Sequence, residues 1–223
     1  MKYEPRRLLD VLINPSALWD VLREYFNLDR WRRSHPISDQ SALQEFLNTR
    51  ASYVAQVSLY GYLRTRAGMR YPELFDDDAF VHSINIAKWQ IWLACLSDLA
   101  IYTGGLLMRH PQADSKTIAV IVHDTVDAIL NETGLPADAG SEFKPYAQQI
   151  RQRLMNCNWA EVTDDEAPFS ESPRALVQWA PIVEDLKQLD EEIVRNSVRF
   201  RWQKVRRELR NSLNTGGILG IQP

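Results

Sequence analysis

One stretch of the sequence restricts the fold more than any other. From Asp77 to Met108, apolar side chains recur on nearly every side of a helix, and a helix of this kind must be surrounded by other apolar surfaces. The stretch has no run close to the ~18 uninterrupted apolar residues of a membrane span. The residues that interrupt its most apolar part are Asn85, Lys88, Gln90 and Asp98. The pattern therefore predicts a long helix at the centre of a bundle rather than a transmembrane helix.

The rest of the chain also follows a helical period. No run alternates apolar and polar residues for long enough to predict a sheet, and the Asn-Gly and Asp-Gly pairs typical of hairpins are absent. A chain of 223 residues with 45% hydrophobic residues can bury a core without metals or disulfides. We therefore predict an all-α fold, an irregular bundle of about six to eight helices. Its core helices are expected at residues 39–67, 77–108, 115–133 and 141–156.

Capping residues set the expected helix boundaries. Ser38 or Asp39 is expected to begin the first core helix, and Gly68 to end it. The acidic run at 76–78 precedes the central helix, where negative charge is favoured by free N–H groups and by the helix dipole. Ser115 is expected to cap the next helix, which Gly134 ends.

Composition divides the chain into four regions. Residues 1–36 form an amphipathic N-terminal arm, and residues 37–156 form the helical core bundle. Residues 157–174 are acidic and rich in Pro and Ser, which predicts an exposed linker. Residues 175–223 are expected to form a long charged helix followed by a loose tail.

The last long helix separates its charges. Acidic residues fill its first part, and basic residues interleaved with apolar ones fill its second part, although the net charge of the whole chain is only −3. We expect this second part to contact a protein partner or an anionic surface such as nucleic acid or membrane headgroups. The residues concerned are Arg195, Arg199, Arg201, Trp202, Lys204, Arg206, Arg207 and Arg210. Two alternatives are that the charges complement the helix dipole, or that the arginines pair with the acidic linker at Asp164, Asp165 and Glu166.

The N-terminal arm combines apolar and basic side chains. Trp19 and Trp31 lie among leucines and arginines, a mixture typical of a segment that rests on a partner or on a membrane surface. The alternative is that these residues pack against the bundle as an ordinary first layer.

Polar residues inside the predicted core suggest a second kind of site. Arg50 falls on the apolar stripe of its helix, and Asp98 lies on the most apolar helix of the chain. A pocket between these helices would hold a small ligand. Its expected lining is Arg50, Tyr53, Tyr60, Lys88, Trp92 and Asp98. The alternative is an Arg50–Asp98 ion pair that satisfies both buried charges.

Several chemistries find no support in the sequence. It has no GxSxG, GxxxxGK[ST], GxGxxG or HExxH motif and no paired Cys/His set, so we expect neither a metal nor a cofactor. Cys95 and Cys157 lie far apart, which is compatible with a reducing compartment. Our leading hypothesis is a non-catalytic cytoplasmic interaction protein: an adaptor, an assembly factor or a subunit of a complex. Attachment to a membrane surface, a small-molecule site in the bundle and nucleic-acid binding through the arginine-rich helix remain as alternatives.

Overall fold

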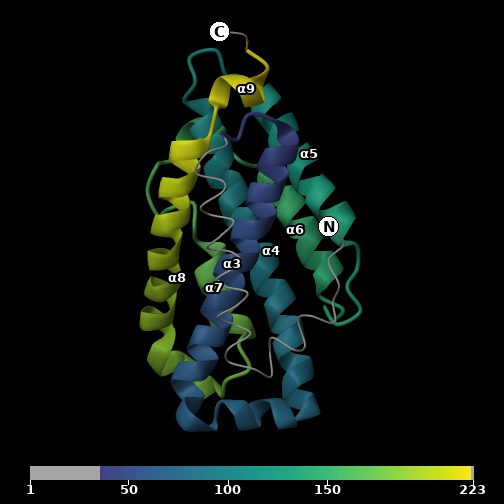
Figure 1. Ribbon diagram of the computed structural model, residues 1–223, viewed down its shortest axis with the longest axis vertical. Coiled ribbons are helices and arrows are strands. Elements are labelled where there is room, and N and C mark those ends of the chain that lie inside the picture. Colours follow the sequence, from purple (N-terminus) through teal and green to yellow (C-terminus); the bar gives the residue numbers. More distant parts are fainter. Residues whose placement is uncertain (1–35, 222–223) are drawn as a thin grey trace.

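The computed structural model describes residues 36–221, and over this range it contains helices and turns but no β-strand (Figure 1). The predicted all-α bundle of six to eight helices is confirmed. Seven α-helices are described: α3 (Gln40–Ala67), α4 (Asp78–Met108), α5 (Ser115–Thr133), α6 (Phe143–Met155), α7 (Glu171–Trp179), α8 (Glu184–Ser212) and α9 (Thr215–Leu219). The 3-10 turns are η1 (Gly68–Arg70), η2 (Pro72–Asp76) and η3 (Trp159–Glu161). The predicted arm with Trp19 and Trp31 lies outside the described residues.

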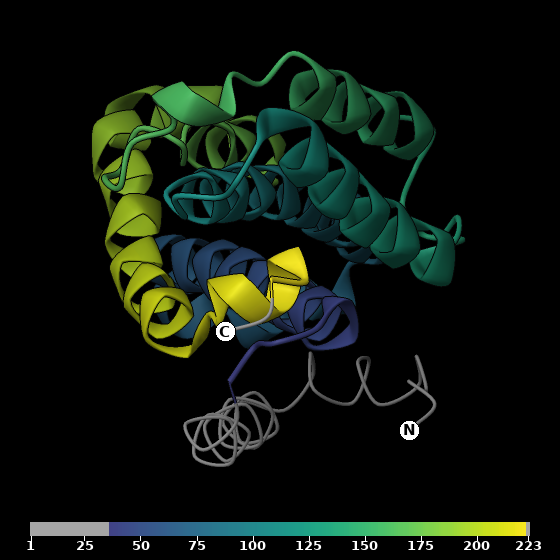
Figure 2. The same cartoon turned by 90° about the horizontal axis from the view of Figure 1, so that it is seen from above.

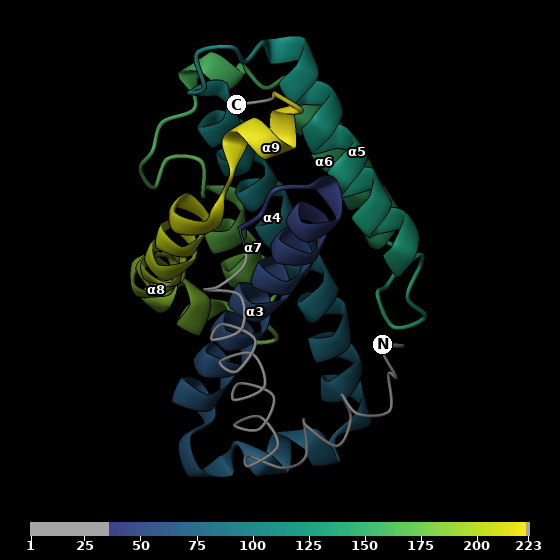
Figure 3. The same ribbon diagram turned by 45° about the horizontal axis from the view of Figure 1, so that its top comes forward.

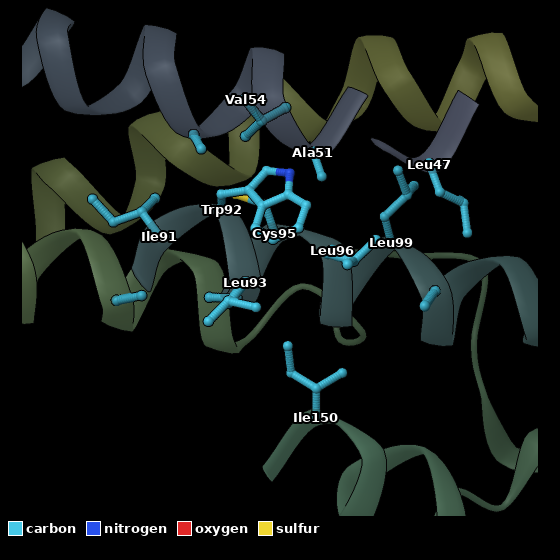
Figure 4. Packing of buried hydrophobic residues seen from close by; sticks show 14 of the residues in the cluster. Leu47, Ala51, Val54, Ile91, Trp92, Leu93, Cys95, Leu96, Leu99 and Ile150 are labelled. Atoms are coloured by element: carbon cyan, nitrogen blue, oxygen red, sulfur yellow. The ribbon is translucent and has the colours of Figure 1, made fainter. Parts of the chain in front are cut away.

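Helix α4 is the centre of the bundle, as predicted. It contacts α3, α5, α6 and α7, and leucines from its middle pack against side chains of α3 and α6 (Figure 4). By length and composition α4 is the one helix in residues 36–221 that would suffice to cross a membrane. However, 89% of its most apolar 18-residue window is buried inside the protein, and buried core helices meet the same criteria of length and composition.

The helix ends follow the predicted capping chemistry with one exception. The Asp39 carboxylate accepts from the Ala42 N–H, and Asp77 accepts from two N–H groups at the start of α4. Gly68 ends α3 with a φ of 55°, and Gly134 ends α5 with a φ of 64°. Residues that have a Cβ atom rarely adopt such positive φ values. The α5 cap is Asp114 rather than Ser115, because a carboxylate one residue earlier reaches the N–H groups of Lys116 and Thr117.

The predicted exposed linker at residues 157–174 is exposed only in part: acidic residues such as Glu161, Asp165 and Glu166 face solvent, but the segment also contributes to the core. Trp159 and Phe169 are both buried. The Phe169 ring lies 5.1 Å from that of Tyr102 and 4.7 Å from that of Trp202, measured between centroids. Apolar residues among the acidic ones therefore anchor the segment between α4 and α8.

The C-terminal end of the chain closes back onto the first core helix. The Ile37 N–H donates to the Ser212 carbonyl at 2.7 Å, and the Asn214 N–H donates to the Ile37 carbonyl at 2.9 Å. Short helix α9 then crosses near the beginning of α3 (Figure 3). The tail that was predicted to be loose is therefore packed against the start of the bundle as far as residue 221.

Candidate functional site

Two charged residues of the predicted ligand pocket, Arg50 and Lys88, have acidic partners on different elements. Arg50 Nε lies 2.8 Å from Glu208 Oε2 on α8, whereas the Lys88 amine lies 3.3 Å from Asp138. Trp92 stacks on Phe143 in the core, and Tyr53 and Tyr60 are part of α3, where burial raises the pKa of Tyr60. The predicted Arg50–Asp98 pair is wrong, because each charge has another partner. Helix periodicity placed both residues facing inward but did not show which helix each one faces.

Asp98 is instead the hub of a polar cluster that joins four helices. Its carboxylate accepts from Arg153 Nη1 on α6 at 2.7 Å. It also accepts from the N–H and the hydroxyl of Ser172 on α7, at 2.8 and 2.7 Å. The Ser172 hydroxyl in turn accepts from the Trp202 indole N–H on α8 at 2.9 Å. We name Asp98, Arg153, Ser172 and Trp202 the Asp98 cluster.

The Asp98 cluster caps a helix from another part of the chain. The N-cap residue of α7, Ser170, makes no side-chain capping bond, and the carboxylate of Asp98 takes its place by accepting from the N–H groups of Glu171 and Ser172. Burial raises the pKa of Asp98, while the Arg153 charge and the Ser172 hydrogen bonds oppose this effect. The arrangement satisfies buried donors, which is a structural role.

Trp202 is therefore not available to a partner. It was predicted as a contact residue because it lies among arginines, but it is only 1% exposed and faces Phe169 and α7, with its indole N–H bonded. Its helix presents Val194, Val198, Val205 and Leu209 on the same buried side.

A second cluster gathers arginines around one carboxylate. Arg210 Nη1 donates to Asp164 Oδ1 at 2.6 Å, Arg206 donates to the Asp164 carbonyl at 2.6 Å, and Arg109 Nη1 lies 3.0 Å from Asp164 Oδ2. The Tyr102 hydroxyl donates to the same carboxylate at 2.6 Å. We name these five residues the Asp164 cluster. The alternative prediction that the arginines pair with the acidic linker is thus confirmed for Arg206 and Arg210.

The other predicted basic residues of α8 have local partners or partial burial. Arg195 pairs with Glu191 at 2.5 Å, Lys204 with Glu208 at 3.5 Å, and Arg199 donates to Asn196 at 3.1 Å. Burial lowers the pKa of Arg201, whose guanidinium lies against Gly61. Arg207 is exposed. Much of the predicted positive charge is therefore matched within the protein.

A pocket of about 360 Å³ opens beside the Asp164 cluster. It lies between the C-terminal end of α4 and the η3 segment, which Trp159 and Val162 hold against Gly104 and Gly105. Its lining combines Arg109 and Asp164 with Glu161 and with apolar side chains. The one arginine and two carboxylates of this lining give it a formal charge of −1.

The electrostatics of Asp164 make a testable prediction. Partial burial raises its pKa, but hydrogen bonds from Tyr102 and Arg210 outweigh this and lower the pKa to about 2. A carboxylate with a lowered pKa stabilises the fold above its unfolded pKa, and this contribution is lost as the pH falls from 3.8 to about 2. After allowance for solvent screening, we expect Asp164→Asn to lower the free energy of unfolding by about 1 kcal/mol at neutral pH.

Urea unfolding of the wild type and of Asp164→Asn, between neutral pH and pH 3, measures this difference in the free energy of unfolding. The difference should be constant above the unfolded pKa and should shrink below it, because Asp164 then takes up a proton in the unfolded wild type while it stays ionised in the folded protein. A difference that does not change with pH would contradict the assignment. Asp124→Asn, an exposed acid on α5, is the matched control and should change stability little at any pH.

The outer side of α8 exposes large apolar side chains. Leu189, Ile193 and Phe200 are 77%, 72% and 70% exposed. At 100° per residue these three side chains fall within about 40° of one another, opposite the buried side of the helix. We name them the outer stripe. Helix α8 forms one edge of the bundle, and among residues 36–221 no other element lies over its outer side (Figures 1 and 2).

Sequence analysis missed the outer stripe. All three residues are plainly apolar, but helix α8 carries apolar residues on two sides and sequence alone did not separate them. In residues 36–221, no three His, Cys, Asp or Glu side chains are grouped as a metal site.

Comparison with known proteins gives no functional information about this chain. No protein-family model, no curated protein and no solved structure matches this chain.

Proposed function

We propose that this chain is a non-catalytic interaction protein, an adaptor or a subunit of a complex, and that it contacts its protein partner through the outer stripe of α8. One observation supports this above all others: three large apolar side chains lie together on one helix face and are each at least 70% exposed. Single exposed apolar residues are common on protein surfaces, whereas several large ones on one helix face favour an interaction site.

The rest of the molecule fits this proposal. The buried carboxylates of Asp98 and Asp190 have structural partners. Cys95 and Cys157 are free thiols, which suits the cytoplasmic location that we propose. We do not extend the proposal to nucleic acid, because Arg206 and Arg210 are held by Asp164.

Under this proposal the centre of the contact surface is the outer stripe rather than the arginines predicted from the sequence. The basic residues of α8 then act mainly at the rim, where charge affects the rate and selectivity of association more than affinity. The large apolar side chains at the centre contribute most of the affinity, as is usual for the centre of protein interfaces.

A double substitution tests the proposal. We expect Ile193→Glu with Phe200→Glu to reduce partner capture by at least about tenfold when tagged protein is purified from its native cell, since each change places a charge in an apolar contact. The captured proteins are compared by quantitative mass spectrometry. Stability should change little, because both side chains are exposed.

The matched control is Val120→Glu with Met155→Glu, which charges two exposed apolar residues on α5 and α6. This variant should capture the same proteins as the wild type. Equal capture by all three proteins would refute the proposed surface.

A further inference from the structure

The outer stripe belongs to a longer pattern on α8. Seven positions on its solvent side follow alternating steps of three and four residues, the spacing of the a and d positions of a coiled coil. They are Leu186, Leu189, Ile193, Asn196, Phe200, Gln203 and Arg207. The side chains that face the bundle, such as Val198 and Trp202, lie on the opposite side. Helix α8 therefore has one seam that is buried in this chain and a second seam that no other helix among residues 36–221 covers (Figures 1 and 2).

Charged residues flank the open seam at heptad spacing. Asp185, Glu192 and Arg199 occupy equivalent positions seven residues apart, each directly before an a position. The sign changes from negative to positive along the helix. A helix with this pattern is complementary to itself only when the second helix runs in the opposite direction.

We infer that the occupant of the outer stripe is a second copy of this chain, packed with the two α8 helices antiparallel about a twofold axis near residues 194–196. Phe200 of one protomer then packs against Leu189 of its partner, and the reciprocal contact forms on the other side of the axis. Glu192 lies opposite Arg199 of the partner, and this pair also forms twice. The inference rests on the proposed function, because it takes the same surface as the site of protein binding.

A parallel pair is less favourable on charge grounds. In a parallel coiled coil, the residue before an a position faces the residue that follows the next d position of the partner. That places Arg199 against Lys204 and Glu192 against the neutral Ser197. The parallel pair would therefore set two positive side chains together and lose both Glu–Arg contacts.

The seam also predicts the strength of association. Helix α8 has 29 residues and is about 44 Å long, enough for an extended contact. Its apolar positions stop at Phe200, and Asn196, Gln203 and Arg207 make the remainder polar. Such a contact is small for a permanent dimer, so we expect a dissociation constant on the order of 10 µM.

Sedimentation equilibrium of the full-length protein from about 1 to 200 µM tests the inference. The wild type should change from monomer to dimer over this range. Phe200→Glu should raise the dissociation constant at least tenfold, whereas the control Val120→Glu should leave it unchanged. A wild type that remains monomeric at the highest concentration overturns the inference.

A charge exchange tests the antiparallel arrangement. Glu192→Arg alone and Arg199→Glu alone should each weaken the dimer several-fold, because each sets like charges opposite one another. The double variant should return the dissociation constant to within about twofold of the wild type, since opposite charges would again face each other across the interface at these two positions. Additive weakening in the double variant overturns the antiparallel pairing.

The two proposals fail in different ways. If the wild type is monomeric but the Ile193→Glu, Phe200→Glu double variant loses captured proteins, self-association is refuted and the proposed interaction surface stands, with a different protein as its occupant. If the wild type is monomeric and capture is unchanged, both proposals are refuted.

Discussion

Asp98→Asn is expected to lower the free energy of unfolding by about 3–4 kcal/mol. An amide has the size of the carboxylate but brings its own N–H donors toward Arg153 or Ser172, which are donors as well. A partly buried guanidinium would lose its counter-charge, and the first N–H groups of α7 would keep only one acceptor oxygen in place of two. For a chain of this size the melting temperature should fall by on the order of 10 °C. Urea unfolding monitored by circular dichroism measures the free energy of unfolding, and a thermal scan monitored by the same signal measures the melting temperature.

A second variant separates the capping role of Asp98 from its ion pair. Arg153→Met removes the positive charge but leaves the carboxylate with three donors, from Glu171 N and from the N–H and hydroxyl of Ser172. It should therefore cost less than Asp98→Asn. Asp124→Asn on the exposed side of α5 is the control and should stay within about 0.5 kcal/mol of the wild type. A loss below about 1 kcal/mol for Asp98→Asn would show that the cluster contributes little to stability.

Asp98 also illustrates what the sequence was able to predict. A carboxylate on the most apolar helix had to be paired, because an unpaired buried charge is too costly. Helix periodicity could then show that it faces inward. The partner was beyond this kind of reasoning, since Arg153 lies 55 residues away on a helix whose rotation and tilt depend on packing. An Arg50–Asp98 pair was considered because Arg50 falls on the apolar stripe of its helix, and α3 does contact α4. The side of α3 that carries Arg50 instead meets Glu208 of α8.

Helix α8 shows a different limit. The sequence predicted its length and the separation of its charges, but two of its sides are apolar at helical spacing. The side with Val198 and Trp202 is buried against α3 and α7, whereas Leu189, Ile193 and Phe200 remain outside. Hydrophobicity by itself does not predict which of two such sides is buried. The order of burial follows from shape and from contacts such as the Trp202 to Ser172 hydrogen bond.

The acidic segment after α6 was misjudged for a related reason. Its charges and prolines are typical of an exposed linker, but two aromatic residues carry enough apolar surface to hold it against the bundle. The sequence did contain an indication of this contact with the bundle, namely the adjacent glycines Gly104 and Gly105 near the C-terminal end of α4. Glycine inside a helix is unfavourable unless another group approaches the backbone closely.

Those glycines support the other prediction with a large expected effect. We expect Gly104→Ala to lower the free energy of unfolding by about 2–3 kcal/mol. A Cβ atom at this position would lie 2.3 Å from the buried Trp159 ring, too close for either group to remain in place. Helix propensity alone predicts the opposite sign, a gain of about 0.5–1 kcal/mol. The direction of the change, measured by urea unfolding, therefore shows whether the contact with Trp159 determines the outcome.

A matched glycine and a double-mutant cycle complete the test. Gly61 also lies inside a long helix, but a Cβ atom there would meet only the end of the flexible Arg201 side chain, at 3.2 Å. Gly61→Ala should therefore be neutral or slightly stabilising. In a Trp159→Ala background the ring is gone, so Gly104→Ala should become neutral or stabilising and the two substitutions should couple by about 3 kcal/mol. If Gly104→Ala is equally harmful with and without the ring, close packing of Trp159 is not the reason for the glycine.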